Sequence, residues 1–381
     1  MPTSFFIGTM PSSIIAITDS MPESISAITN HNLAPEAAQS LKTRGRMGSV
    51  TGVQIASTGF YVPERTVTNE DLAALGCDSE WIIRRTGIRE RRRAAPDQAT
   101  SDLAYQASLE CMQKAGVTAS EIDLILVATV TPDHRIPSTA CHLQRMLGAT
   151  CPAMDLSAAC AGFVYALLTG SQFISAGNAR CVLVVGADLM TQTVDPSDVK
   201  TFPLFGDGAG AAIITADDTT ADDGDAEQQA GILAYQLGSE GEGADMLCIP
   251  GGGSRQPFTS DNLAGSQYMT MDGRSVFKWA VRVFSESATE VLAHCGVAPS
   301  DLSLVVMHQA NQRIIDAAVA DLGVDSKKVF VNLDRYGNTS AASIPLALAE
   351  AASEGRIQKG DYVLLSGFGA GLAWGTAVLR W

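Results

Sequence analysis

The sequence predicts an α/β protein built from two similar halves. From residue 50 onward, short β-branched segments alternate with longer segments of helical period, a pattern typical of strands joined by crossover helices. Residues 116–127 (GVTASEIDLILV) resemble residues 296–307 (GVAPSDLSLVVM), and each segment follows a helical stretch. Residues 182–186 likewise resemble residues 363–367. We therefore expect a duplicated fold whose halves pack through their apolar sheets or covering helices, the alternative being chance similarity of two βα units.

Composition narrows the class of protein. The chain has 381 residues, 46% of them hydrophobic and 18% charged, as in globular enzymes. A net charge of −15 disfavours binding to nucleic acid or to an anionic membrane. Eight scattered cysteines without a CxxC pair or a nearby histidine indicate neither zinc nor thioredoxin-like chemistry. This cysteine pattern predicts no metal site, and without a signal-peptide pattern it favours a reducing cytoplasm. No apolar segment is long enough to span a bilayer.

Three regions follow one another along the chain. Residues 1–46 are rich in Ser, Thr, Ala and Pro, and we interpret them as a disordered extension or as a misassigned start before Met47. The acidic segment 217–227 is typical of a solvated connection. We therefore assign residues 47–222 to the N-terminal half and residues 223–381 to the C-terminal half.

Cys160 is the first candidate for chemistry. It lies in DLSAACAGF, after a predicted strand over 153–156 and before a helix over 161–176 that is apolar on nearly every face. The N-terminus of a buried helix favours the thiolate form of a cysteine, and a central helix would place the thiol at the end of a tunnel. A core cysteine is the alternative interpretation.

Two polar residues follow other predicted strands. His308 ends the strand 304–307, and Asn338 lies between a predicted strand over 329–333 and a helix over 344–354. Residues 367–375 (GFGAGLAWG) form a Gly-rich turn able to direct backbone N–H groups at an oxyanion, and no nucleotide-binding fingerprint is present. Cys, His and Asn together fit a papain-like hydrolase or a thioester-condensing enzyme, and the duplicated plan favours condensation.

Six strings in colinear order carry a resemblance to a known family. DSEWIIRRTGIRERR, DLSAACAGF, LFGDGAGAA, HQANQRI, YGNTSAAS and GFGAGLAWG closely resemble the β-ketoacyl-acyl carrier protein synthase III enzymes of fatty-acid initiation, over residues 50–381. The resemblance implies a thiolase fold of five α-β-α-β-α layers, usually as a homodimer. It also implies condensation of a short acyl-CoA, expected to be acetyl-CoA, with malonyl-acyl carrier protein, without a cofactor.

The resemblance also implies roles for individual residues. Cys160 matches the nucleophile, and His308 with Asn338 matches the pair that binds the malonyl thioester oxygen. The backbone N–H groups of Cys160 and Ala370 match the first oxyanion hole, although Ala370 stands where the family has glycine. Phe368 matches the aromatic residue beside the malonyl carboxylate.

Further matches concern coenzyme A, the acyl pocket and the carrier protein. Trp81, Arg85 and Thr86 match coenzyme A contacts, while Val199-Lys200 replaces a residue pair that often includes arginine. Ile136 matches an acyl-pocket residue, often Phe, that is supplied across the dimer interface. The expected docking patch for acyl carrier protein comprises Lys278 and Arg313, supported by Arg274 and Arg282, which share one helix face, but Ala320 and Asp321 replace two lysines.

Three other functions remain open at this point. A condensing enzyme or acyltransferase of secondary metabolism would share the fold and the catalytic residues. A non-catalytic thiolase-fold binding protein would not need an intact set of Cys, His and Asn. A cysteine hydrolase would resolve the acyl-enzyme with water, whereas a condensing enzyme forms a 3-ketoacyl product only with malonyl-carrier protein.

Overall fold

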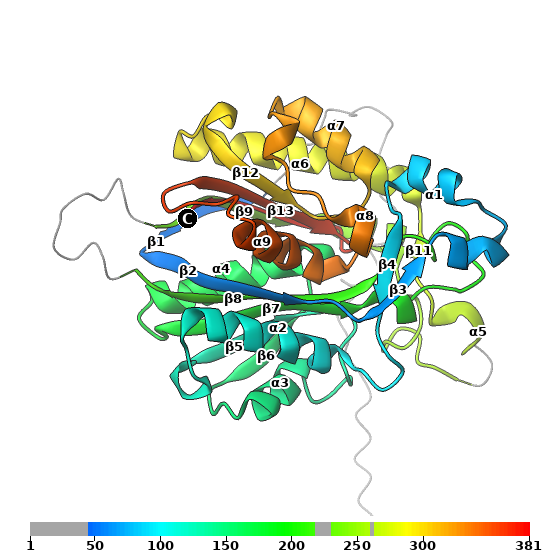
Figure 1. Ribbon diagram of the computed structural model, residues 1–381, viewed down its shortest axis with the longest axis horizontal. Coiled ribbons are helices and arrows are strands. Elements are labelled where there is room, and N and C mark those ends of the chain that lie inside the picture. Colours follow the sequence, from blue (N-terminus) through cyan, green and yellow to red (C-terminus); the bar gives the residue numbers. More distant parts are fainter. Residues whose placement is uncertain (1–44, 218–229, 260–262) are drawn as a thin grey trace, which may run out of the picture. The chain divides into compact units, whose positions relative to one another are not determined.

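Two five-stranded sheets form the framework of the protein (Figure 1). The structure, a computed structural model, describes residues 45–217, 230–259 and 263–381. The first sheet contains, in spatial order, β2 (Val53–Tyr61), β8 (Asp207–Ala216), β7 (Cys181–Leu189), β5 (Leu124–Ala128) and β6 (Ala153–Leu156). The second contains, in spatial order, β1 (Arg46–Thr51), β9 (Gly231–Ser239), β14 (Ala373–Arg380), β13 (Tyr362–Gly369) and β12 (Leu302–Met307).

The two sheets repeat one pairing pattern. In the first, β5 and β7 are parallel neighbours, and β8 and β2 follow in antiparallel pairs. In the second, β12 and β13 are parallel, and β14 and β9 follow in antiparallel pairs. This correspondence agrees with the duplication that the repeated segments predict.

One predicted strand is wrong. The segment 329–333 would match β6, but it forms only an isolated parallel bridge between Val329 and Val305. The chain then leaves the sheet because the N–H of Asn332 donates to the side-chain oxygen of Gln309, and the short helix α8 (Leu333–Tyr336) begins at the next residue.

Helices occupy three layers around the sheets (Figure 1). The layer between the sheets contains α4 (Gly162–Ser175) and α9 (Ser343–Ser353), whose apolar residues pack on both inner faces. Outside the first sheet lie α2 (Thr100–Ala115) and α3 (Thr139–Leu147), and outside the second lie α6 (Gly273–Cys295) and α7 (Gln312–Leu322). The result is the five-layer arrangement of the thiolase fold.

Glycines on the first sheet allow α9 to approach it closely. A Cβ added at Gly186 of β7 would lie 2.3 Å from the carbonyl oxygen of Ala341, and one at Gly210 of β8 would lie 2.5 Å from the backbone nitrogen of Leu346. No side chain fits at these distances, so glycine is required where the start of the helix meets the sheet.

The remaining elements lie in the connections. They are α1 (Ser79–Thr86), α5 (Leu263–Ser266), the strand pair β3 (Arg65–Thr68) with β4 (Glu90–Arg93), and the pair β10 (Leu247–Cys248) with β11 (Thr270–Met271). Among the helices that the structure describes, none is long and apolar enough to cross a membrane. Nor do the described residues include a cluster of three or more His, Cys, Asp or Glu arranged to hold a metal ion.

The chain enters the second sheet before it enters the first. Arg46, predicted to end a disordered extension, already pairs with Leu237 in β1, so regular structure begins earlier than predicted. Residues 1–44 lie outside the described residues. The predicted boundary between residues 222 and 223 also lies outside them, between β8 of the first sheet and β9 of the second.

Candidate active site

The candidate nucleophile lies where the N-termini of the two central helices meet. Short 3₁₀ turns precede both helices, Ala159–Ala161 before α4 and Ser340–Ala342 before α9. The sulfur of Cys160 lies 3.7 Å from the hydroxyl oxygen of Ser340. Ala159 and Ser340 have φ angles of 45° and 51°, and no other described residue with a side chain has positive φ. Such left-handed residues gather at functional sites, and here both adjoin the thiol.

Burial dominates the ionisation of Cys160. The residue is 7% exposed, and loss of solvation raises the pKa of its thiol to about 12. The hydroxyl of Ser340 lowers this pKa, whereas the charge of Asp188 raises it. The N-terminus of α4 favours the thiolate, as the sequence predicted, but burial opposes it. In the absence of substrate, Cys160 is therefore a thiol.

The Gly-rich end of β13 approaches Cys160 closely. A Cβ added at Gly369 would lie 2.9 Å from Cβ and 3.1 Å from Sγ of Cys160, and one at Gly367 would lie 2.8 Å from Cα of Ala161. Ala370, the next residue, is not among the described residues with positive φ. Its Cβ is therefore compatible with the turn, and its backbone N–H remains available as the predicted donor.

His308 directly follows β12 and is 2% exposed. Its backbone N–H donates to the carbonyl of Ser366, and its Nδ1 lies 2.7 Å from the hydroxyl of Ser343. The ring meets Phe368 edge to face, with centroids 5.6 Å apart. Burial lowers the pKa of the imidazole to about 3, so the ring is neutral at physiological pH. A neutral ring can donate one hydrogen bond but is a weak base.

Asn338 lies in the loop between α8 and the turn that precedes α9. Its side-chain oxygen accepts the backbone N–H of Ser340 at 2.9 Å, and its own N–H donates to the carbonyl of Leu204 at 2.8 Å. With the amide oxygen held by the backbone, the amide NH2 is the group left to act on a ligand. The residue is 7% exposed and does not cap α9, which begins after Ala342.

Asp188, near the end of β7, links the loop after β5 to the turn before α9. It is fully buried, and burial raises its pKa. Its carboxylate accepts hydrogen bonds from Thr129, Val130 and Thr131 on one side, and from the backbone N–H of Ala341 on the other. The carboxylate thus holds the turn that contains Ser340 beside Cys160.

One cavity of about 970 Å³ connects these groups. Cys160, His308, Asn338, Phe368 and Ala370 all line it. Its apolar walls also include residues of β10 and β11 and of the loop before β8, namely Leu247, Ile249, Met269, Met271, Leu204 and Phe205. An apolar cavity of this size with a few polar groups at one end is suited to a long, flexible substrate.

Charged residues on the cavity lining are mainly basic. The single acid among its lining residues is Asp272, against five bases, namely Arg85, Lys200, Arg274, Lys278 and Arg313. The guanidinium of Arg85 lies over the ring of Trp81, 4.5 Å from its centroid, and Thr86 follows on the same helix, α1. This local excess of positive charge, in a chain of net charge −15, favours anionic ligands.

Two predicted residues lie outside this lining. Ile136 is 86% exposed in the single chain and does not line the cavity. Arg282, although on α6 with Arg274 and Lys278, is ion-paired with Glu240 at 3.1 Å and with Glu286 at 3.6 Å. Its charge is offset by these partners, so it adds less to a docking patch than the helix spacing predicts.

Sequence reasoning missed three residues of the site, namely Ser340, Ser343 and Asp188. The two serines lie in the YGNTSAAS string that drew attention to Asn338, and Asp188 interrupts the apolar strand VLVVGADL. A polar residue within a buried apolar segment is the signal that would have identified Asp188. Their partners come from distant segments and could not be assigned from spacing.

The chain is similar to known proteins of one family. The family model described as 3-oxoacyl-[acyl-carrier-protein (ACP)] synthase III matches residues 154–241, and its C-terminal model matches residues 292–381. A beta-ketoacyl-[acyl-carrier-protein] synthase III of Rhodopirellula baltica is 67% identical over 345 residues, covering 88% of this chain and 100% of the relative.

Solved structures are similar over the same region. The 3-oxoacyl-[acyl-carrier-protein] synthase III of Aquifex aeolicus VF5 is 42% identical with a TM-score of 0.78, covering 88% of this chain and 100% of the other. The priming beta-ketosynthase of the R1128 polyketide biosynthetic pathway is 36% identical with a TM-score of 0.78, covering 88% and 97%.

Proposed function

Because the chain belongs to the 3-oxoacyl-[acyl-carrier-protein] synthase III family, we propose that Cys160, His308 and Asn338 divide the family's condensation between them. The chain is an acyltransferase that carries out the condensation that initiates fatty-acid synthesis. The observation that supports the residue roles best is that all three line one buried cavity and that each is held by a specific partner.

Cys160 performs the first half-reaction. Its sulfur attacks the carbonyl carbon of a short acyl-CoA, and the carbon–sulfur bond to coenzyme A breaks. Acetyl-CoA is the substrate used to test this step. The thiol proton leaves Cys160 and ends on the coenzyme A sulfur, so no proton is gained or lost overall. The backbone N–H groups of Cys160 and Ala370 stabilise the negative oxygen of the tetrahedral intermediate.

His308 and Asn338 perform the second half-reaction. The malonyl thioester loses CO2, and its electron pair forms an enolate whose oxygen accepts hydrogen bonds from the imidazole and from the amide NH2. The enolate carbon then attacks the acyl group on Cys160, giving a 3-ketoacyl thioester and the thiolate of Cys160, which takes up one proton from solvent to return to the thiol. The neutral state of His308 suits a donor, and Phe368 keeps the surroundings of the departing carboxylate apolar.

The basic residues of the cavity lining support the proposed partners. Trp81 and Arg85 would hold the nucleotide end of coenzyme A by stacking and charge, and Thr86 and Lys200 line the same cavity. Arg274, Lys278 and Arg313 form an exposed basic group at the cavity, which fits an acidic acyl carrier protein. Free thiols, with all eight cysteines unpaired, are compatible with a reducing cytoplasm, where we place the reaction.

A homodimer would give Ile136 a role. An isoleucine that is 86% exposed is costly in water, and burial against the acyl pocket of a partner subunit would remove it from solvent. A β-branched side chain there would shape the pocket differently from an aromatic ring. Because the chain is also similar to a polyketide priming enzyme, acyl groups other than acetyl are the alternative substrates. Intact-mass analysis after exposure to a panel of acyl-CoAs shows which acyl group Cys160 accepts.

Separate assays of the two half-reactions test these roles. In His308→Ala and Asn338→Ala, we expect Cys160 to be acylated by labelled acetyl-CoA as in the wild type. Release of labelled CO2 from malonyl-carrier protein should fall by roughly a hundredfold or more, because one donor to the enolate oxygen is lost.

Matched controls are available on the surface. His294→Ala and Asn178→Ala remove an exposed histidine and an exposed asparagine, and both half-reactions should be unchanged. Cys160→Ser should fold but never gain the acyl mass. A papain-like hydrolase predicts that His308→Ala abolishes acylation, and equal loss of both half-reactions in Asn338→Ala would contradict the roles proposed here.

A further inference from the structure

Ser343 is the side-chain partner of His308, and neither residue reaches solvent appreciably. Its hydroxyl lies 2.7 Å from Nδ1 of the imidazole, and the two residues are 1% and 2% exposed. Because a hydroxyl both donates and accepts, two arrangements fit this distance. In one, Ser343 donates to an unprotonated Nδ1 and the ring proton is on Nε2. In the other, Nδ1–H donates to Ser343 and Nε2 carries no proton.

The chemistry of the enolate distinguishes these arrangements. Nδ1 is occupied by Ser343, so Nε2 is the ring nitrogen left to meet a substrate oxygen. A negative oxygen is stabilised by Nε2–H and repelled by the lone pair of an unprotonated Nε2. Since the ring is neutral, it cannot carry a proton on both nitrogens.

Neighbouring hydrogen bonds leave the hydroxyl of Ser343 free to donate to the ring. A serine within a helix commonly donates to the carbonyl four residues earlier. For Ser343 that carbonyl belongs to Thr339, which accepts the backbone N–H of Ala342 at 3.0 Å, whereas the contact that the structure gives to the Ser343 hydroxyl is the one to Nδ1 of His308.

A polar network links the residue after His308 to helix α9, which carries Ser343. Gln309, the next residue after His308, donates to the carbonyls of Met307 and Phe330 at 2.8 and 3.2 Å. Its side-chain oxygen accepts the N–H of Asn332, whose amide donates to Glu350 of α9 at 2.8 Å.

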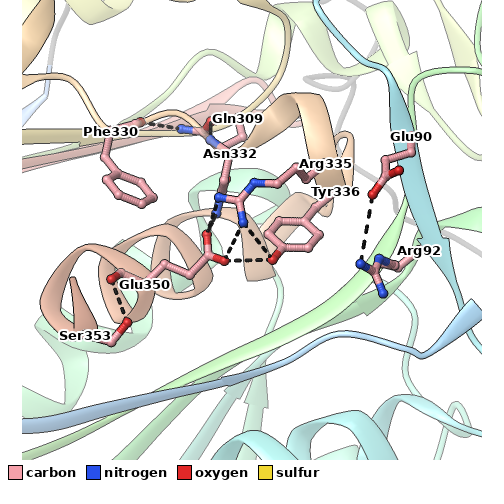
Figure 2. A network of polar contacts seen from close by, with 9 residues as sticks. All are labelled: Glu90, Arg92, Gln309, Phe330, Asn332, Arg335, Tyr336, Glu350 and Ser353. Carbon is pink, nitrogen blue, oxygen red and sulfur yellow. Dashed lines mark hydrogen bonds and ion pairs between the residues drawn. The ribbon is translucent and has the colours of Figure 1, made fainter. Parts of the chain in front are cut away.

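Glu350 anchors the other end of this network. Figure 2 shows Arg335 and Tyr336 of α8 converging on the same carboxylate, at 3.1 and 2.7 Å. Helix α9 therefore carries both Ser343, which contacts the imidazole of His308, and Glu350, which binds the segment 332–336. The network therefore connects the helix that carries Ser343 to the residue that follows His308.

We propose that Ser343 is a positioning residue whose hydroxyl donates to Nδ1 of His308 and thereby keeps the ring proton on Nε2, the nitrogen that meets the malonyl oxygen. The proposal deepens, and rests on, the role proposed above for His308. It assigns the choice of tautomer to a single hydroxyl on the central helix.

Nitrogen NMR of the imidazole-labelled enzyme tests the tautomer directly. The chain has five histidines, and His308→Ala identifies the signals of His308 by their loss. We expect the wild type to carry the proton on Nε2, with the ring neutral between pH 6 and 8. A proton found on Nδ1 would overturn the proposal whatever the activity.

Variants at Ser343 test its consequence. In Ser343→Ala we expect a shift toward the Nδ1–H tautomer and a fall of about tenfold or more in CO2 release, with acylation of Cys160 unchanged. Ser343→Thr retains the hydroxyl and should restore both the tautomer and the rate. Ser171→Ala removes a buried serine from the other central helix, whose hydroxyl donates to Leu167, and should change neither.

The outcomes separate this proposal from the proposed function. Equal loss of both half-reactions in Ser343→Ala, or an unchanged tautomer and rate, would refute the positioning role. Normal CO2 release by His308→Ala would instead refute the enolate role of His308, while the NMR result for Ser343 would still stand on its own. If Ser343→Ala does not fold, the wild-type spectrum and Ser343→Thr still decide the matter.

Discussion

Burial sets the protonation states of the reacting side chains. Cys160 and His308 lie in the same water-poor cavity, and loss of solvation disfavours the charged form of each, raising the thiol pKa and lowering the imidazole pKa. A thiolate–imidazolium pair, which a papain-like hydrolase requires, is therefore the least favoured combination. A neutral thiol beside a neutral imidazole suits an enzyme whose histidine donates a hydrogen bond without taking a proton.

The pH dependence of alkylation measures the state of Cys160. With a pKa of about 12, the thiol is protonated throughout the neutral range, and the reactive thiolate increases about tenfold for each pH unit. We expect the rate of Cys160 modification by iodoacetamide, measured on the peptide that contains it, to keep rising from pH 6 to pH 9. A rate that levels off below pH 8 would show that the N-terminus of α4 outweighs burial. Cys111, also buried and with its pKa raised by burial to about 11, is an internal comparison.

Helix ends and strand ends meet at the site, and small residues make their approach possible. The turns before α4 and α9 lie against each other, and the last residue of β13, Gly369, lies against Cys160. A helix N-terminus offers free N–H groups, so two of them at one point favour oxygen anions. The helix N-termini thus provide a positive potential at the site, and the side chains provide the specific hydrogen-bond donors.

Gly369→Ala tests this close approach. The added Cβ would lie 2.9 Å from Cβ of Cys160 and 3.1 Å from its backbone nitrogen, so either the nucleophile or the turn must move. We expect acylation by acetyl-CoA to fall at least about tenfold, because a small misplacement of reacting atoms is costly in rate. Single-turnover acylation and circular dichroism measure the effect and the fold.

Gly253→Ala is the matched control for that variant. An added Cβ at Gly253 meets no atom within 4 Å, so acylation and folding should be unchanged. Wild-type acylation by Gly369→Ala would contradict the geometry described for the oxyanion-binding turn.

The duplicated architecture places the site at the junction of the two halves. Cys160 comes from the first repeat, whereas His308 and Asn338 come from the second, at the ends of corresponding segments. Neither half contains a complete set, so catalysis depends on the packing of α4 against α9 between the sheets. Strand β1 also joins the two halves, because it lies at the start of the N-terminal half in sequence but belongs to the second sheet.

Shortening the chain tests which part of the N-terminus the body needs. A chain that begins at Met47 loses Gly45 and Arg46 from the described residues, and with them the Arg46–Leu237 pair at the start of an edge strand. We expect its Tm and turnover to equal those of the full chain within error.

A second shortened chain, which begins at Gly52, should be less stable than the chain that begins at Met47. It loses all of β1, including Val50, which is 3% exposed, so we expect a clearly lower Tm. Scanning calorimetry and CO2 release distinguish the two chains. A large loss in the chain that begins at Met47 would contradict the interpretation of residues 1–46 as dispensable.

The sequence by itself determined the duplicated α/β fold and the principal candidates, Cys160, His308 and Asn338. Repeated segments 180 residues apart indicate the duplicated fold, and polar residues at the ends of apolar strands indicate the candidate residues. Both signals are local patterns, or repeats of local patterns, so they can be read without knowing how the chain folds back on itself.

Only the tertiary structure decided what each candidate touches. Ser343 at Nδ1 of His308, Ser340 beside Cys160 and Asp188 under the turn before α9 are contacts between segments that are far apart in the chain. The tertiary structure also decided the protonation states of Cys160 and His308, because these depend on how completely the two halves exclude water from the cavity. Ile136 shows the same limit, since its exposure depends on which surfaces the fold leaves uncovered, a property that no local pattern encodes.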